Sequence, residues 1–389
     1  MGLFTIGGRG LVEIKFFEML GRMKLIVTLG FVLLATGTMA DPPQALRVEA
    51  NEIVPLPVGE VALAEHRVGA HADGQYLEKV TDRDDAVRLQ IFLDGVGFGP
   101  GVIDGKPGRF TRLGLNAWNE ANGHALDDAG PAIARARREL ARPYARAVVP
   151  GVAGEWVNPK LSYKRVEQAK SKRMSYRSYG EFMAERFHTD VAFLVELNDQ
   201  ASVDQAIPGS HLVVPNVGPF RIESLSREPF EEKEVLMSRH MVIDTNEKQA
   251  RIYEATPKAL VVQESDDGLV VEANRALVAS FPITPGQEKF IRYGTWEMKN
   301  AVPFPYWRYD QTFLDTGKRS DEALNIPPGP NSPVGVIWMG LNVSGIGVHG
   351  TSDPETIGRS RSAGCIRMSN WNAARLPDLI RPGATVEIR

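Results

Sequence analysis

Cys365 is the only cysteine among 389 residues, and His349, one of seven histidines, lies sixteen positions before it. A free thiol has a pKa of about 8.5 and reacts as the thiolate, so an imidazole that takes its proton makes it a nucleophile near neutral pH. Between the two lie Gly350, Gly358 and Gly364, which favour a tight loop over a helix. The segment therefore indicates a cysteine–histidine pair held by one strand and its loop.

The other role for a single cysteine is that of an inert buried thiol, and the N-terminus bears on this choice. An apolar run of eleven residues, 25–35, follows a start at Met23 and a lysine, and small residues at 38 and 40 suit a cleavage site. The run is too short to span a bilayer. We therefore expect residues 1–40 to be a signal peptide, and the mature protein to be exported to a periplasm or cell wall without a membrane anchor.

Export bears on whether the single cysteine is inert or reactive. Exported proteins commonly pair their cysteines in disulfides, which a solitary cysteine cannot do within its own chain. A working thiol is therefore favoured over an inert one. The formal charge of −3 and the absence of a long basic run argue against a nucleic-acid partner. The sequence indicates no cofactor and no metal site, and it leaves the oligomeric state open.

The elements that must position the pair lie in residues 238–389. Period-two alternation with frequent Gly and Pro breaks predicts a mainly antiparallel β domain. A hairpin is expected over 241–253, extended segments with a turn at Asn274 and Arg275 over 269–281, and strands at 334–339 and 346–349, the last carrying His349. A helix is expected over 371–379, and a closing strand over 384–389.

This block resembles the L,D-transpeptidase catalytic domain, also called the YkuD domain. The matching residues are Gly347-Val348-His349-Gly350-Thr351, Ile357-Gly358 and Ser362-Ala363-Gly364-Cys365-Ile366-Arg367-Met368. The family often has a histidine where this chain has Ala363. The resemblance implies an L,D-transpeptidase-like β-sandwich, with Cys365 as nucleophile and His349 as general acid and base. It also implies supporting positions at Ser362, Gly364, Arg367 and Gly350.

The roles of two of these supporting residues stay open. Ser362 orients the site or stabilises a turn, and Arg367 binds a substrate carboxylate or braces the loop through an acidic partner. Backbone N–H groups of Gly364 and Cys365 are candidates for stabilising an oxyanion. The resemblance implies that Cys365 attacks a peptidoglycan stem tetrapeptide, releases its terminal D-alanine and forms a thioester that an amine resolves. The alternatives are hydrolysis, as a carboxypeptidase or amidase, and a non-catalytic peptidoglycan-binding protein.

Small modules are expected upstream, after an N-terminal segment at 41–83. Residues 84–125 resemble a helical peptidoglycan-binding domain, on Leu89-Gln90, Leu93, Gly97-Phe98, Pro100-Gly101, Ile103-Asp104-Gly105, Gly108 and Thr111. Residues 176–220 resemble a βααβ LysM module, on Ala184, Phe187, Val191, Leu194, Leu197-Asn198, Pro208-Gly209, Leu212 and Val214-Pro215-Asn216. Residues 126–175 are expected to link the two modules. The alternative for residues 84–125 is a helical hairpin used only for packing, and the alternative for residues 176–220 is a spacer. Asp104 is expected to cap a turn, and His188 is expected to be exposed.

Overall fold

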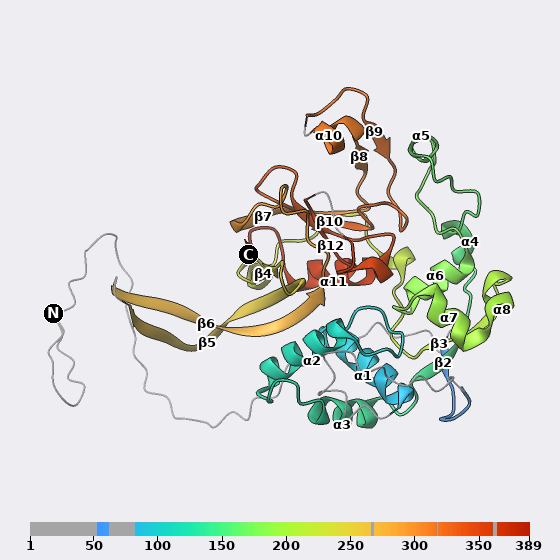
Figure 1. Cartoon of the computed structure of the whole chain (residues 1–389), viewed down its shortest axis with the longest axis horizontal. Coiled ribbons are helices and arrows are strands. Elements are labelled where there is room, and N and C mark those ends of the chain that lie inside the picture. Colours follow the sequence, from blue (N-terminus) through green and yellow to red (C-terminus); the bar gives the residue numbers. More distant parts are fainter. Residues whose placement is uncertain (1–52, 62–81, 266–267, 317, 361–363) are drawn as a thin grey trace. The chain divides into compact units, whose positions relative to one another are not determined.

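A computed structural model describes residues 53–61, 82–265, 268–316, 318–360 and 364–389 (Figure 1). The predicted signal peptide and Ser362 lie outside these residues. In the described part of the chain, no helix combines the length and apolar character needed to cross a bilayer.

Both helices predicted for residues 84–125 are present. Helix α1 (Arg83–Gly95) begins at Asp82, whose side chain accepts a hydrogen bond from the Asp85 backbone N–H. Helix α2 (Arg109–Asn122) ends at Gly123, and α3 (Gly130–Glu139) follows. Asp104 caps a turn as predicted, since its Oδ1 accepts from the Lys106 backbone N–H at 2.8 Å and from Gln90 Nε2 at 2.9 Å.

The segment expected to be a linker is folded over much of its length. Strand β2 (Tyr144–Val148) lies between β1 (Ile53–Pro55) and β3 (His211–Pro215) in an antiparallel sheet. The strand partner of β3 thus comes from residues 144–148, ahead of residues 176–220, within which the βααβ resemblance places both strands. Strand formation is favoured here because Tyr144, Ala145 and Ala147 are buried.

The residues from 149 to 178, here called the insertion, run between β2 and the helices that follow it. They contain α4 (Ala153–Trp156) and α5 (Arg165–Gln168). Three further helices complete this part of the chain: α6 (Tyr179–Arg186), α7 (Val191–Asn198) and α8 (Gln200–Asp204). Trp156, Leu161 and Met174 are buried. These three side chains anchor the insertion to the rest of the protein, while its lysines are exposed.

The C-terminal block is built on a mixed, mainly antiparallel eight-stranded sheet of order β12-β11-β10-β7-β13-β4-β5-β6. Its strands are β4 (His240–Asp244), β5 (Gln249–Ser265), β6 (Gly268–Pro282), β7 (Gly294–Pro303), β10 (Ile337–Leu341), β11 (Gly347–His349), β12 (Ile366–Arg367) and β13 (Thr385–Ile388). Only β11 with β12, and β13 with β4, run parallel among the described pairs. The predicted hairpin, the strand carrying His349 and the closing strand are all present.

Smaller elements surround this sheet. Helix α9 (Glu234–Met237) precedes β4, and α11 (Asn370–Leu379) follows β12 at the predicted place. Strands β8 (Trp307–Tyr309) and β9 (Leu324–Ile326) pair with each other around α10 (Gln311–Thr316). A short 3-10 turn, Pro354–Thr356, follows β11.

Two details of the predicted β domain differ. The expected turn at Asn274 and Arg275 is wrong, because β6 runs through these residues opposite β5. The expected sandwich is instead one hydrogen-bonded sheet. Strand β7 pairs with β13 through residues 294–297 and with β10 through residues 298–303, and so joins the two halves.

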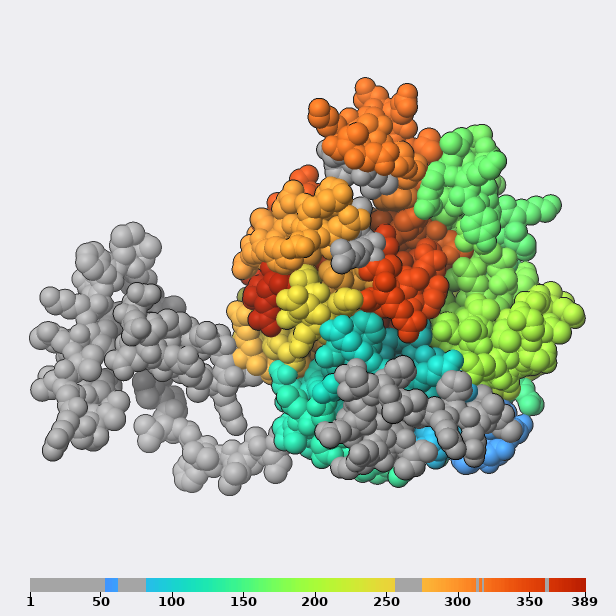
Figure 2. Space-filling view, in the orientation of Figure 1, coloured from blue at the N-terminus to red at the C-terminus, as the bar shows by residue number. Residues whose placement is uncertain are grey.

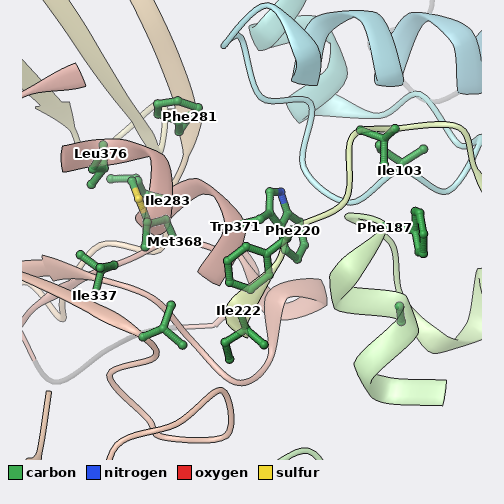
Figure 3. Close-up of a cluster of buried hydrophobic side chains, with 14 of the residues drawn as sticks. Ile103, Phe187, Phe220, Ile222, Phe281, Ile283, Ile337, Met368, Trp371 and Leu376 are labelled. Atoms are coloured by element: carbon green, nitrogen blue, oxygen red, sulfur yellow. The ribbon is translucent and has the colours of Figure 1, made fainter. Parts of the chain in front are cut away.

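One hydrophobic core runs through both the upstream part and the C-terminal block of the described chain. Figure 3 shows Trp371 beside Phe220 and Ile222, with Ile337 and Met368 of the sheet region nearby. The side chains of Trp371 and Phe187 are no more than 1% exposed. The two parts are therefore packed as one folded body rather than joined by a free linker.

His188 lies in this core, so its predicted exposure is wrong. It is 2% exposed, stacks on Trp371 at 5.3 Å and bonds through Nδ1 to Asp94 Oδ2 at 2.8 Å. Burial lowers the pKa of His188. Burial opposes ionisation of Asp94, but Arg375 and His188 outweigh it and lower the pKa of that carboxyl. A polar contact between distant segments explains what local sequence did not reveal.

Glu185 of α6 is a second buried contact between the two parts. Its carboxyl accepts from Asn370 Nδ2 at 2.7 Å and bonds to the Tyr176 hydroxyl. Asn370 in turn accepts through Oδ1 from the Val336 backbone N–H at 3.1 Å. Burial raises the pKa of Glu185 to about 8, although both hydrogen bonds act in the opposite direction. Glu185 is therefore mostly protonated at neutral pH.

We expect the folded protein to lose stability between about pH 4.5 and pH 8 through this group. Over that window the unfolded state releases the Glu185 proton while the folded state keeps it, so the free energy of unfolding falls as pH rises. Glu185→Gln imitates the protonated acid, so the free energy of unfolding of this variant should not show the decrease, on the order of a few kcal/mol, that Glu185 causes in the parent protein. Urea unfolding at pH 5, 7 and 8.5 measures the difference between the two proteins. Parallel pH dependences would contradict the assignment.

Candidate active site

The two candidate catalytic residues are carried by neighbouring strands. Strands β11 and β12 are parallel, with Val348 opposite Ile366 and His349 opposite Arg367. Cys365 directly precedes β12, two positions before Arg367. Because side chains alternate between faces along a strand, His349 and its partner Arg367 fall on the same face. The sheet register therefore places His349 at the end of β11 and Cys365 immediately before the neighbouring strand β12.

The His349 ring is held by two contacts. The side chain is 3% exposed, and Nδ1 lies 2.6 Å from the carbonyl oxygen of Gly350. Since a carbonyl can only accept, Nδ1 carries the proton, and Nε2 is left as the basic nitrogen. The ring also stacks on Trp338 of β10, with centroids 5.6 Å apart and planes at 17°. His349 is thus fixed in one tautomer and one orientation.

The thiol is placed by a loop that requires glycine. Cys365 Sγ donates to the Gly345 carbonyl oxygen at 3.2 Å. The preceding Gly364 has φ +115°, a conformation that residues with a side chain rarely adopt. A Cβ added to Gly286 would lie 2.4 Å from the Cα of Gly364, so the two backbones pass in direct contact. The backbone beside the sulfur therefore requires glycine at both positions.

Both candidate groups are neutral at rest. Although part of Cys365 reaches solvent, burial of its sulfur raises the pKa to about 11, against a hydrogen bond from the Gly347 backbone and the charge of Arg367. Burial lowers the pKa of His349 to about 4, and Arg367 acts in the same direction, while the hydrogen bond to Gly350 acts against it. The sequence predicts an imidazole that takes the proton of the thiol near neutral pH, which would leave an imidazolium beside a thiolate. The structure favours a thiol and a neutral imidazole, so the proton moves when the sulfur attacks.

We expect alkylation of Cys365 by iodoacetamide to accelerate from pH 7 through pH 10 without a plateau near neutrality. A pKa of about 11 leaves roughly one thiol in ten thousand ionised at pH 7. Intact-protein mass spectrometry gives the rate at each pH. His349→Asn is the control, and it should leave this dependence in place because no imidazolium supports the thiolate. A plateau below pH 8 that His349→Asn abolishes would show a resting ion pair instead.

The other predicted site residues fall around the pair. The Gly350 carbonyl orients His349, and a Cβ at this position would lie 2.1 Å from Asn370 Oδ1. Arg367 lines a cavity of about 250 Å³ together with Thr351. Among the described residues, no acidic group lies within 4 Å of Arg367, which favours substrate binding over bracing by an ion pair. Ser362 falls outside the described residues, and its role remains a prediction.

Several residues near the site had not been assigned to it from the sequence. The sequence alone does not distinguish Trp338 from a core aromatic residue, and only the β10–β11 register reveals its contact with His349. Arg165 and Arg177 line the cavity beside Arg367, yet both belong to the segment expected to be a linker. No local pattern in the sequence marks them. Of the residues that the structure describes, no group of three or more His, Cys, Asp or Glu side chains is placed to hold a metal ion.

The sequence of this chain is similar to that of known proteins. The chain is 38% identical over 65 residues to a putative L,D-transpeptidase YkuD of Bacillus licheniformis, covering 17% of this chain and 39% of that protein. It is 37% identical over 65 residues to the protein of the same name in Bacillus subtilis, covering 17% and 40%. The chain thus spans about 40% of the length of these curated relatives.

Solved structures give a weaker likeness. An L,D-transpeptidase from Mycobacterium smegmatis aligns at 17% identity and a TM-score of 0.27, over 39% of this chain and 58% of that one. An L,D-transpeptidase from Stackebrandtia nassauensis aligns at 14% identity and a TM-score of 0.25, over 43% and 62%. The family model described as the L,D-transpeptidase catalytic domain matches residues 257–388, which include His349 and Cys365. On sequence, residues 257–388 of this chain are thus similar to the L,D-transpeptidase catalytic domain.

Proposed function

We propose that the protein is a cysteine-dependent L,D-transpeptidase that acts on peptidoglycan stem peptides through a thioester. The observation that carries this proposal is the parallel pairing of β11, which ends at His349, with β12, which Cys365 directly precedes, inside a segment that matches the L,D-transpeptidase catalytic domain. A solitary thiol and an imidazole with a free Nε2 suffice for acyl transfer. Export to the cell envelope, as the N-terminal segment predicts, would deliver the protein to this substrate.

The reaction follows from the neutral resting pair. As Cys365 Sγ attacks the carbonyl carbon, its proton passes to Nε2 of His349, and the carbonyl electrons move to oxygen. Backbone N–H groups at Gly364 and Cys365 are the proposed donors to that oxyanion. The C–N bond then breaks, the departing D-alanine amine takes the proton from His349, and a thioester remains. An acceptor amine attacks the thioester, His349 takes its proton, and the thiol is restored.

Nothing in this sequence of steps separates transfer from hydrolysis, because both begin with the same thioester. The test is incubation of the purified full chain with a disaccharide-tetrapeptide, followed by mass spectrometry of the products. A cross-linked dimer supports transfer, and a tripeptide alone supports a carboxypeptidase. The absence of any Cys365-dependent product would leave only a non-catalytic role in peptidoglycan binding and would refute the proposal.

We further propose that the upstream part of the chain holds the enzyme on peptidoglycan. Helices α1 and α2 lie in residues 84–125, and α6, α7, α8 and β3 lie in residues 176–220, the two segments that resemble wall-binding modules. Since these segments share a core with the catalytic domain, sedimentation with insoluble wall material should use the full chain rather than a fragment. Binding by the Cys365→Ala protein would separate wall attachment from turnover.

A further inference from the structure

A cavity of about 250 Å³ opens beside the candidate active site, between the insertion and the loop that follows β11. The insertion contributes Tyr163, Arg165, Gln168 and Arg177, and the catalytic domain contributes Arg367 with residues 351–353. In Figure 2 the green surface of the insertion lies against the orange surface of the catalytic domain. A cavity of this size holds one substituent of a peptide rather than a whole ligand.

The charges around this cavity are unbalanced. Arg165, Arg177 and Arg367 line it, while Asp353 is the single acidic residue of the lining. No ion pair within 4 Å joins Asp353 to any of the three among the described residues. The Nε atoms of Arg177 and Arg367 are buried, and neither donates a hydrogen bond to a described group. Three guanidinium groups against one carboxylate in the lining favour an anionic ligand in this cavity.

The two arginines of the insertion are held in place before any ligand arrives. Arg165 donates through Nη1 to Gln168 Oε1 at 2.7 Å and lies over the rings of Trp307 and Tyr309, 5.2 and 5.7 Å from their centroids. Arg177 lies over the ring of Tyr163 at 4.2 Å. Such stacking orients a guanidinium while leaving its N–H groups available at the edge of the plane.

The insertion is itself fixed to the catalytic domain. The Met174 backbone N–H donates to the Pro328 carbonyl at 2.9 Å, and Asn331 Nδ2 donates to the Ser175 carbonyl at 2.8 Å. Met174 and Ser175 lie just before Arg177 in the chain, and their partners Pro328 and Asn331 lie on the segment that leads to β10. The position of the cationic side chains relative to Arg367, and hence to Cys365, is therefore set by backbone contacts.

We propose that this cavity binds a carboxylate of the acyl-donor peptide, with Arg165 and Arg177 of the insertion as specificity-determining residues beside Arg367. The inference rests on the proposed function and adds to it the substrate group that the upstream part of the chain recognises. A planar carboxylate matches the fork of a guanidinium, and three cations repel an acceptor amine. Because Arg367 lies two residues from Cys365, the bound carboxylate sits close to the reacting carbonyl on the donor.

The test measures binding apart from turnover. In the full-length Cys365→Ala protein, calorimetry would compare a stem tetrapeptide with analogues in which one carboxylate at a time is a carboxamide. We expect one analogue to bind roughly tenfold or more weakly, as loss of a charge-assisted hydrogen bond predicts. Adding Arg177→Gln or Arg165→Gln should weaken binding of the free acid to a similar extent and abolish discrimination against that analogue. Arg177→Lys, which keeps the charge but not the fork, should fall between.

Arg173→Gln is the matched control. Arg173 belongs to the same insertion, lies over an aromatic ring, that of Trp156 at 3.9 Å, and does not line this cavity. Its substitution should leave discrimination intact. Equal binding of all analogues by the Cys365→Ala protein, equal losses with Arg173→Gln, or equal competition by inorganic phosphate would overturn the proposal. Discriminating binding without any product from the Cys365 protein would instead refute the transpeptidase activity and leave the carboxylate site standing.

Discussion

Cys365→Ala should lower kcat/KM for a stem-tetrapeptide donor by about 10⁴-fold or more, to a level indistinguishable from background. Every step from donor to product passes through the sulfur, and no other cysteine exists in the chain to replace it. Residual transition-state contacts from Gly364 and Arg367 cannot form a thioester. The loss should therefore fall on kcat, while the donor still binds.

The measurement is product formation by mass spectrometry together with trapping of the acyl-enzyme as a mass increase on the intact protein. Cys365→Ser is the matched variant, since it keeps the size of the side chain but is a far weaker nucleophile, and it should be almost as inactive. Both proteins should unfold at nearly the parent temperature because Cys365 is partly exposed. Turnover that survives in either variant would place the nucleophile elsewhere.

His349→Asn should lower kcat by about 10²- to 10⁴-fold, the usual contribution of a positioned acid–base group. The asparagine Nδ2 can keep the hydrogen bond that Nδ1 donates to the Gly350 carbonyl at 2.6 Å. The fold of the loop is thus retained while the basic nitrogen is removed. The acyl-enzyme should form slowly, and adding a stronger acceptor amine should not restore its rate of formation.

The pH dependence gives a second readout for the same residue. Because the pKa of His349 is lowered to about 4, kcat/KM of the parent should be flat from about pH 5 to pH 7 and fall as the pH drops through 4. Protonated imidazole cannot accept the thiol proton. His349→Asn should lack this acid limb. His240→Asn is the control: His240 lies in β4 of the same sheet, bonded to Thr385 Oγ1 at 2.7 Å, and its loss should leave the limb intact.

The sequence was sufficient for the elements that carry the pair. Strand alternation predicted the segment ending at His349, and the helix after Cys365 followed from its apolar spacing. Local patterns of this kind reflect one face packed on a core, so they are readable without tertiary information. The tautomer of His349 and the neutral resting state of the pair depend on burial and on a neighbouring strand, which local spacing does not encode.

Contacts between distant segments account for the remaining differences. Residues 144–148 became a strand because β1 and β3 lie on either side of them, although the surrounding sequence had suggested a linker. His188 is buried because Asp94 and Trp371, far away in the chain, meet it from two sides. Arg165 and Arg177 also lie beside the candidate site because segments far apart in the chain come into contact. Such residues are polar and lie in irregular segments, where periodicity carries no information.

The shared core has a consequence for how such a protein would work on a polymer. Where a flexible tether joins a binding module to an enzyme, the catalytic group samples every strand within the length of the tether. Here the insertion and the Glu185–Asn370 contact fix the upstream part to the segment that leads into the site. If the upstream surface binds a glycan strand, Cys365 can reach only those stem peptides that lie at one fixed distance from the bound strand. The protein would then act only where the spacing between glycan strand and peptide matches that distance.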